Sequence, residues 1–308
     1  MEKLYEKVVL GIIVYKNKYV FHLRKKEPYK EMIGLVGGKV EKEETTDESI
    51  IREVFEETGL KCKKISLLGI VKDNFLNNKK IKINYLFVYL IDAVGEIKEK
   101  KDEGEIVVFS KEKQIEKMKA KFIPTDYLIF EKYKKSQLHY LETMIKIDEK
   151  NKSINFSYKD FFNKKKCVII GSFRKHINLV NYIVNLFKKN QIEVLSPETC
   201  NVINPDDNFV LFDYDPPILN EGEIQTIVLK KMHIVDFVYL INPEGYLGKS
   251  AAFEIGYAFA NNLKVFSFEK ISKEMHKHFV SGVFSPEEIV DNYDEILGLY
   301  NFRRSKTI

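Results

Sequence analysis

The feature that most constrains the fold is a glycine-containing loop that leads into a helix crowded with carboxylates. The loop reads Gly38-Lys-Val-Glu-Lys-Glu-Glu44, and Arg52-Glu-Val-Phe-Glu-Glu-Thr-Gly-Leu60 follows shortly after it. Thr45 and Glu48 have the spacing of a capping box, which predicts the start of a helix. Gly59 stands where a left-handed C-terminal cap ends one. The sequence therefore predicts a single helix between these two caps.

Glu53, Glu56 and Glu57 fall on one arc of this helix, spanning about 100°. Carboxylates held that close repel one another unless a positive charge lies among them. Their oxygens suit Mg²⁺ or Mn²⁺, which bridge the phosphates of a substrate. Glu44 in the loop can pair with Arg52 and fix the loop on the helix. A solvated acidic helix face is the alternative, but the glycine and arginine positions favour a metal site.

This segment resembles the Nudix box, the signature of the Nudix hydrolases. The resemblance covers about half of the chain and implies the Nudix fold, a mixed α+β sheet between helices. It also implies hydrolysis of a nucleoside diphosphate linked to a group X, with Glu53, Glu56 and Glu57 as catalytic metal ligands. Gly37, Gly38 and Arg52 are expected at the substrate. The matching positions are Gly38, Glu44, Arg52, Glu53, Val54, Glu56, Glu57, Gly59 and Leu60.

The family often supplies a further catalytic acid from a distant loop. Glu103 and Glu105, in the run Asp-Glu-Gly-Glu-Ile, stand where that acid is expected, and we predict Glu103 to be catalytic. An ordinary acidic turn is the alternative. Residues 35–41 look like the branch of the family that acts on nucleoside triphosphates, including oxidised ones. Asp126, which follows Pro124, can read a base edge or serve as an acidic residue at a helix N-terminus.

The length of 308 residues suits two domains. Residues 1–147 mix strands with helices, and we expect a helix from Asp126 to Leu141. In the carboxylate-bearing helix, Ile51, Val54 and Phe55 form an apolar stripe that should dock on a sheet. The polar segment 148–165 is interpreted as a linker. Residues 166–308 alternate strands with helices, which predicts an α/β domain with a doubly wound parallel sheet, Rossmann-like or flavodoxin-like.

Two segments of the second domain place polar groups at strand ends. The first, Gly171-Ser-Phe-Arg-Lys-His176, opens a helix directly after a strand, where backbone N–H groups, a hydroxyl and an arginine can cradle an anion. A plain strand-to-helix turn is the alternative. The second contains Gly248 and Ser250, followed by Glu254 as nearly the only charge on an apolar helix. Burying an ionised carboxylate costs free energy unless it is paired or takes part in catalysis. A structural pairing is therefore the alternative to a catalytic role.

These segments resemble the nucleoside 2-deoxyribosyltransferase superfamily, which includes nucleoside-monophosphate N-glycosidases, over roughly residues 166–269. The resemblance implies that Glu254 attacks, or electrostatically stabilises, the anomeric carbon of the sugar. The family also uses a further acid, for which Asp236 and Asp213 are the candidates. The residues expected to bind the 5′-phosphate, or to lie near it, are Gly171, Ser172, Phe173, Arg174, Gly248 and Ser250.

Composition limits the setting and the partners. The 50 basic residues nearly balance the 45 acidic ones, giving a formal net charge of +5, and lysine is spread along the chain, so a nucleic-acid partner is not indicated. The three cysteines show no paired spacing, which fits a reducing cytosol. No apolar run approaches the ~20 residues that span a bilayer. We expect a cytoplasmic protein without a membrane partner that forms a homo-oligomer through its C-terminal domain.

The sequence thus predicts a bifunctional, Mg²⁺-dependent enzyme acting on small nucleotides. The first domain would convert a nucleoside triphosphate to the monophosphate and pyrophosphate. The second would cleave the N-glycosidic bond of that monophosphate, giving free base and a sugar 5-phosphate. One alternative pairs a hydrolase of ADP-ribose or a dinucleotide with a base-exchanging transferase. Another makes the second domain a non-catalytic nucleotide sensor.

Overall fold

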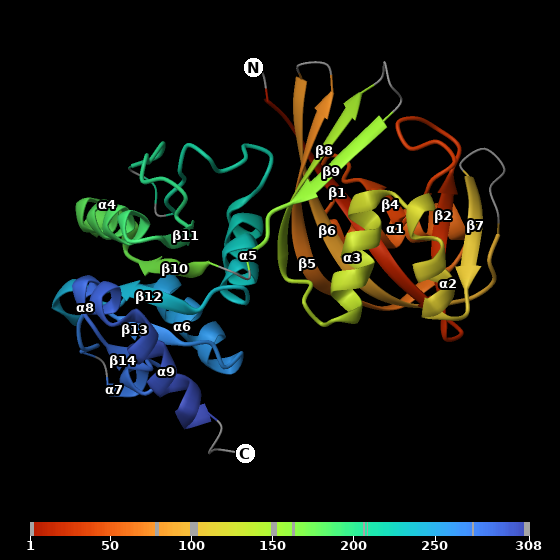
Figure 1. Ribbon diagram of the computed structural model, residues 1–308. Helices are drawn as coiled ribbons and strands as arrows, with labels where there is room; N and C mark the ends of the chain where they lie inside the picture. The colour runs from red at the N-terminus through yellow and green to blue at the C-terminus, as the bar shows by residue number, and fades with distance from the viewer. Residues whose placement is uncertain are drawn as a thin grey trace. The chain divides into compact units, whose positions relative to one another are not determined.

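The computed structural model describes residues 3–77, 80–98, 104–148, 153–161, 164–205, 207, 209–272 and 274–304. The chain divides into two compact units, Met1–Lys159 and Asp160–Ile308, and Figure 1 shows the elements of each. Each unit has a sheet and an apolar core of its own. Among the described residues, no helix is long and apolar enough to cross a membrane.

The first unit is built on a mixed sheet whose main path runs β3-β2-β1-β6-β5-β8-β9, with β4 paired to β1 and β7 paired to β2. The pairs β1–β6 and β5–β8 are parallel, and the other pairs are antiparallel. Its strands are β1 (Lys3–Tyr15), β2 (Lys18–Arg24), β3 (Ile33–Gly34), β4 (Val36–Lys39), β5 (Lys61–Asn77), β6 (Lys80–Val94), β7 (Gly104–Phe109), β8 (Tyr140–Asp148) and β9 (Ser153–Tyr158).

Three α-helices accompany this sheet in the described part of the first unit: α1 (Thr46–Thr58), α2 (Glu112–Lys117) and α3 (Pro124–Lys134), with a 3₁₀ turn η1 (Lys119–Lys121). Both predicted ends of α1 are present. Thr45 and Glu48 form the capping box, and Gly59 adopts the left-handed conformation with φ 73°. The core gathers phenylalanine rings from distant segments, which pack mainly edge to face: Phe21, Phe109, Phe122 and Phe130.

The structure corrects two expectations about the helices of this unit. The helix predicted from Asp126 to Leu141 ends at Lys134, and β8 then begins at Tyr140. The apolar stripe on α1 was also placed wrongly, because Ile51 is 45% exposed and Phe55 is 55% exposed. The face that packs on the sheet instead follows Ile50, Val54 and Thr58, which recur at four-residue spacing and are fully buried.

The predicted linker over residues 148–165 also differs from the structure. Residues 153–158 form β9, which pairs antiparallel with β8 in the register Ile145↔Phe156 and Ile147↔Ile154. The partly buried Phe156 packs against the core of the first unit. This segment is polar in composition, but its apolar residues alternate, and that alternation suffices for an edge strand.

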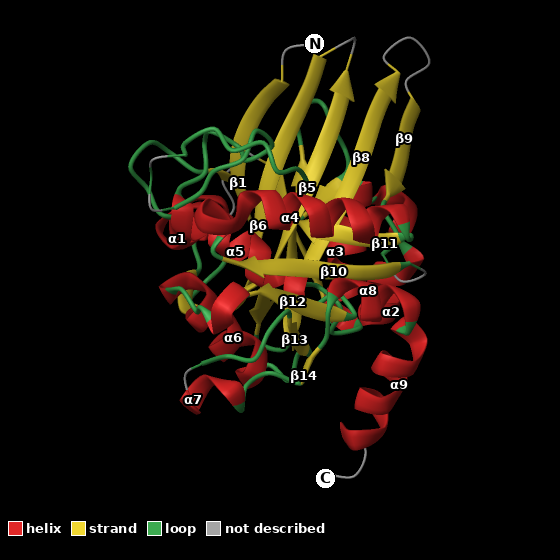
Figure 2. Ribbon diagram, turned by 90° about the vertical axis from the view of Figure 1, so that its left-hand side faces the viewer, coloured by secondary structure: helices red, strands yellow, loops and turns green. Residues whose placement is uncertain are grey.

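The second unit has a parallel sheet in the order β11-β10-β12-β13-β14, as the alternation of strands and helices predicts. Helices α4, α8 and α9 contribute to one core with these strands, and Figure 2 shows α4 running alongside β10. The doubly wound arrangement stays a prediction. The strands are β10 (Lys165–Gly171), β11 (Ile192–Ser196), β12 (Phe237–Ile241), β13 (Val265–Ser267) and β14 (Gly282–Val283). The helices are α4 (Phe173–Lys189), α5 (Glu221–Met232), η2 (Pro243–Gly245), α6 (Lys249–Ala260), α7 (Glu274–Lys277), α8 (Pro286–Asp291) and α9 (Tyr293–Arg304).

Candidate functional site

Arg52 on α1 joins the preceding loop to the carboxylates of the helix. Its Nε and Nη2 donate to the two oxygens of Glu44 at 2.8 and 3.0 Å. Its Nη1 donates to Glu53 Oε1 at 2.8 Å and to Glu56 Oε2 at 3.3 Å. The hydrogen bonds from Arg52, and next from the Ser49 hydroxyl, lower the pKa of Glu44 to about 2. The pairing of Glu44 with Arg52 that the sequence suggested is therefore present, and it fixes the loop on the helix.

Strand β4 carries Gly37 and Gly38, which lie close to β1 on one side and to the Glu53 side chain of α1 on the other. A Cβ on Gly38 would lie 2.3 Å from Glu53 Oε1. Gly37 has φ +152°, and a Cβ there would lie 2.0 Å from the carbonyl oxygen of Val9. Burial raises the pKa of Glu53, while the hydrogen bond from Arg52 opposes that rise. Gly37 therefore lets β4 lie against the backbone of β1, and Gly38 leaves room for the Glu53 carboxylate, which is only 14% exposed.

Glu57, one turn along α1 from Glu53, is held from the side of the sheet. Its Oε2 accepts the backbone N–H of Gly37 at 3.4 Å and lies 3.4 Å from Nδ1 of His22 on β2. The sequence analysis did not single out His22. The only signal for it was a polar residue in an otherwise apolar strand segment, and a strand residue does not reveal which helix it will meet.

The donor set on α1 fits a divalent cation by its chemistry, because carboxylate oxygens are the ligands that Mg²⁺ and Mn²⁺ prefer. Glu53 and Glu57 lie beside the glycines of β4, and Glu56 is half exposed. Within the part of the chain that the structure describes, no three His, Cys, Asp or Glu side chains already gather as a metal site. Arg52 instead supplies the positive charge between Glu53 and Glu56.

The two acids predicted in the distant loop have different outcomes. Glu103 lies outside the described residues, so its catalytic role stays a prediction. Glu105 is on β7, where its exposed side chain lies 3.7 Å from the ammonium group of Lys25. Glu105 is thus a surface acid of a strand, not part of the acidic turn that was the alternative.

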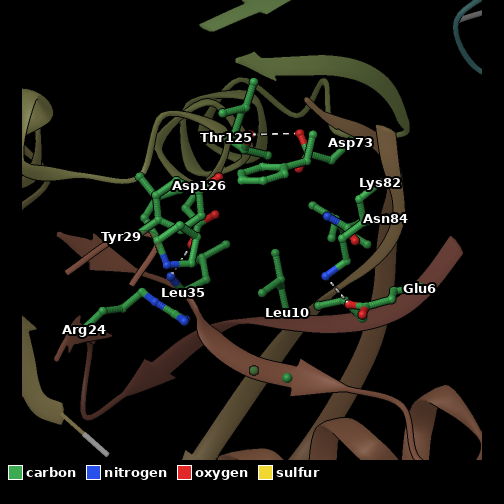
Figure 3. Close-up of a pocket in the computed structure, with 18 of the residues that line it drawn as sticks. Glu6, Leu10, Arg24, Tyr29, Leu35, Asp73, Lys82, Asn84, Thr125 and Asp126 are labelled. Atoms are coloured by element: carbon green, nitrogen blue, oxygen red, sulfur yellow. Dashed lines mark hydrogen bonds and ion pairs between the residues drawn. The ribbon is translucent and has the colours of Figure 1, made fainter. Parts of the chain in front are cut away.

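A cavity of about 800 Å³ opens beside Gly37, Gly38 and Lys39, and Figure 3 shows its lining. Its walls combine apolar side chains with polar and charged ones. Asp126 on α3 is buried in this wall, where its Oδ2 accepts the N–H of Leu35 at 2.7 Å and burial raises its pKa to about 7. The other polar lining residues include Arg24, Tyr29, Asp73, Lys82, Asn84 and Thr125.

Two buried polar atoms of this cavity lack a hydrogen-bond partner among the described residues: Arg24 Nε, a donor, and Asn84 Oδ1, an acceptor. Buried polar atoms are normally paired with protein, water or ligand, so these two atoms of the cavity are open to either water or a ligand. Sequence reasoning missed both residues because they are far apart in the chain, on β2 and β6, and become neighbours of one cavity only in the folded sheet.

Comparison with known proteins identifies this half of the molecule. Residues 5–132 match the family model of the NUDIX domain. These residues form a Nudix domain. The Glu53, Glu56 and Glu57 carboxylates, the glycines of β4 and most of the cavity lining all lie within it.

Two curated relatives match part of the chain. ADP-ribose pyrophosphatase of Methanocaldococcus jannaschii is 38% identical over 100 residues, which are 32% of this chain and 58% of that protein. The 8-oxo-dGTP diphosphatase of Buchnera aphidicola subsp. Schizaphis graminum is 35% identical over 85 residues, which are 27% of this chain and 63% of that protein. The chain therefore spans less than two thirds of the length of either relative. A solved MutT protein from Bacillus halodurans is similar with 22% identity and a TM-score of 0.41, over 50% of this chain and 97% of that chain.

Beyond the Nudix domain, the second unit places both predicted segments at one edge of its sheet. β10 and β12 are parallel neighbours, with Gly171 opposite Ile241. α4 follows β10, with a kink at His176 after its first turn, and α6 follows the loop after β12, so both helices begin at the carboxyl ends of adjacent strands. Gly171 has φ +145°, and a Cβ there would lie 2.5 Å from the carbonyl oxygen of Ile241. Only glycine fits this strand end.

The residues predicted around this edge lie at the starts of the two helices. Ser172 is the N-cap of α4, and its hydroxyl makes no capping hydrogen bond. Gly248 is the N-cap of α6. Arg174 and Ser250 each occupy the second position of their helix. Phe173, by contrast, packs against Phe212, with the two ring centroids 5.7 Å apart.

Glu254 is buried on α6, with 7% of its surface exposed. Its Oε1 accepts a hydrogen bond from Gln225 Nε2 of α5 at 2.9 Å. Burial raises the pKa of Glu254 to about 7, and the hydrogen bond from Gln225 only partly opposes this. The sequence analysis did not single out Gln225, because nothing in the spacing of α5 shows which of its residues faces α6.

Asp236 lies at the other edge of the sheet. It precedes β12 and accepts the N–H of Lys166 at 2.9 Å and the hydroxyl of Tyr293 at 2.8 Å, which ties the start of β10 to α9. α6 begins at the opposite, carboxyl edge, and the role of Asp236 as the further acid stays a prediction. Asp213 is exposed, and hydrogen bonds from Thr199 and Asn201 lower its pKa, which does not suit a proton donor.

Proposed function

We propose that the Nudix domain hydrolyses the diphosphate of a small nucleotide, converting a nucleoside triphosphate to its monophosphate and pyrophosphate. The observation that carries this proposal is that one segment, the glycines of β4, serves two sites. Gly37 and Gly38 contact Glu57 and Glu53 on α1, and both glycines also line the cavity of about 800 Å³. A nucleoside in the cavity would therefore extend its phosphates along β4 toward the carboxylates. Cavities that take small ligands are of this size.

Glu53, Glu56 and Glu57 would hold Mg²⁺, with Mn²⁺ as a substitute. When bound, the cation supplies charge stabilisation at the phosphates and lowers the pKa of bound water. The residues of the chain contribute orientation. Arg52 fixes the loop, and the cavity offers a base the Arg24 Nε donor, the Asn84 Oδ1 acceptor and the Asp126 carboxyl.

Both curated relatives are named for nucleotides that contain a diphosphate, ADP-ribose in one case and 8-oxo-dGTP in the other. The decisive experiment incubates the full chain and Mg²⁺ with a panel of nucleoside triphosphates, 8-oxo-dGTP and ADP-ribose. We expect pyrophosphate and a nucleoside monophosphate from a triphosphate. Preferential cleavage of ADP-ribose to AMP and ribose 5-phosphate would support the alternative substrate class. No turnover of any member with Mg²⁺ or Mn²⁺ would overturn the hydrolase proposal.

We propose that the second unit cleaves the N-glycosidic bond of the monophosphate. The supporting observation is Glu254, a buried carboxyl with a neutral partner, on a helix that opens at the same edge as the α4 N-terminus. The carboxylate of Glu254 would attack the anomeric carbon or stabilise an oxocarbenium-like transition state as the base departs. Water then takes the place of the base, giving a sugar 5-phosphate. Gly171, Ser172 and Arg174 would bind the 5′-phosphate through charge-assisted hydrogen bonds.

Release of free base from a nucleoside 5′-monophosphate, in the absence of any acceptor base, would separate hydrolysis from base exchange. Arg174→Ala should weaken turnover of the monophosphate far more than that of the matching nucleoside. Equal losses on both would remove the phosphate role. Tight monophosphate binding without turnover would instead support a nucleotide sensor. The cytoplasmic setting and the homo-oligomer formed through the second unit stay predictions.

A further inference from the structure

We propose that His22 is a positioning residue of the Nudix metal site, which fixes the orientation of the Glu57 carboxylate. This proposal rests on the proposed function of that site. His22 lies within β2 and is only 6% exposed, next to the buried Val20 and Phe21. A histidine buried in such a strand needs a polar partner. The partner is on α1, where Glu57 Oε2 lies 3.4 Å from His22 Nδ1.

The direction of this contact follows from chemistry. The 3.4 Å between His22 Nδ1 and Glu57 Oε2 is an ion-pair distance, and a carboxylate oxygen can only accept, so the imidazole can hold it only when Nδ1 carries a proton. The N–H of Gly37 donates to the same oxygen, Oε2, at 3.4 Å. Both contacts fall on one side of the carboxylate, and no described residue donates a hydrogen bond to its Oε1 in the structure. Oε1 is therefore the oxygen left for a cation.

The other edge of the imidazole ring meets the start of β7. Gly104 has φ +150°, and a Cβ there would lie 1.8 Å from His22 Nε2. β2 and β7 are paired in the register His22↔Ile106 and Arg24↔Gly104, which holds this backbone over the ring. The imidazole is thus wedged between Glu57 and the first residue of β7, and it cannot rotate away from the carboxylate. Groups that orient a metal ligand in this way typically change metal affinity about 10–100-fold when they are replaced.

The test is Mn²⁺ binding to the full chain without substrate, measured by the electron paramagnetic resonance signal of free Mn²⁺. His22→Phe keeps a ring in the pocket but removes the donor. His22→Asn places an amide N–H close to the position of Nδ1. We expect His22→Phe to weaken Mn²⁺ binding by about 10–100-fold and His22→Asn to restore most of the affinity. His278→Asn, an exposed histidine of the second unit, should bind Mn²⁺ like the parent chain.

Equal Mn²⁺ affinity in His22→Phe and the parent chain would overturn the proposal and leave His22 with a packing role. If His22→Phe fails to fold, His22→Ala gives the same comparison, because it also lacks a donor without adding bulk. Substrate turnover is scored separately. A parent chain that binds Mn²⁺ but hydrolyses no nucleotide refutes the hydrolase proposal. The Mn²⁺ affinities of the His22 variants still test the positioning role in that case. A parent chain that binds no Mn²⁺ refutes the metal site and the role of His22 together.

Discussion

Gln225 Nε2 donates a hydrogen bond to Glu254 Oε1 at 2.9 Å, so that a neutral amide of α5 holds the buried carboxyl of α6. An arginine or lysine in that place would favour the ionised form. The Gln225 amide favours the ionised form only weakly, and burial raises the pKa of Glu254 to about 7. Near neutral pH, small changes in environment would therefore shift the balance between the acid and the carboxylate.

Glu254→Gln should abolish base release while pyrophosphate release continues, since a neutral amide neither attacks the anomeric carbon nor stabilises an oxocarbenium ion. A second readout is stability. Because the pKa of Glu254 rises from 4.5 to about 7 on folding, the folded state binds more protons between these values. Its contribution to stability is therefore greatest below about pH 4.5 and is lost as the pH rises to about 7. Thermal melts of both proteins across this range should differ in slope. Undiminished base release by the variant would refute the catalytic role.

Glu56→Gln and Glu57→Gln should each lower pyrophosphate release by orders of magnitude, because each removes a ligand charge from the cation site. Folding should survive both changes. Glu56 is half exposed, and glutamine at position 57 can still accept hydrogen bonds from Gly37. Glu105→Gln, on the exposed side of β7, is the matched control and should leave the rate within about threefold. Full Mg²⁺-dependent turnover in both variants would refute the metal site.

Gly38→Ala should reduce pyrophosphate release strongly while leaving base release unchanged. The new Cβ would lie 2.3 Å from Glu53 Oε1, so the carboxylate or β4 must shift. Displacements of this size at a reacting centre cost about 100-fold in rate. Gly298→Ala on α9 is the control, because a Cβ there meets no atom within 4 Å. The comparison is the initial rate of pyrophosphate release, and an unchanged rate in Gly38→Ala would show that the close contact is dispensable.

The first unit should fold and hydrolyse nucleotides by itself, provided that it includes β9. A fragment of residues 1–159 should melt cooperatively and retain turnover. A fragment of residues 1–147 lacks β9 and exposes the edge of β8, so we expect a lower melting temperature and a tendency to aggregate. Calorimetry and light scattering on both fragments would check this. Identical melting of the two would mean that β9 contributes nothing to stability.

The parts of the site that sequence predicted are those set by local chemistry. The ends of α1 follow from Thr45, Glu48 and Gly59, whose capping signals act within a few residues. The contact between Glu44 and Arg52 likewise joins a loop to the helix that it precedes. Such short-range relationships leave a readable pattern.

The remaining features depend on tertiary packing. Arg24 and Asn84 become lining residues of one cavity only because β2 and β6 flank β1 in the sheet. Asp236 is a candidate acid in the sequence, and only the folded sheet shows that it lies before β12, where it binds Lys166 and Tyr293. Residues 153–158 were assigned to a linker by their polar composition, although the alternation of Ile154, Phe156 and Tyr158 carried a strand signal.

The pairing of β9 with β8 has a consequence for the tether between the two units. With β9 in the sheet, only the chain from Tyr158 to Lys165 is left to connect them, and its full extension is about 25 Å. Releasing the six residues of β9 would add about 20 Å of contour length. The effective concentration of one unit near the other depends steeply on the length of the chain that joins them. An edge strand of the first sheet therefore sets the length of chain that is left between the two units.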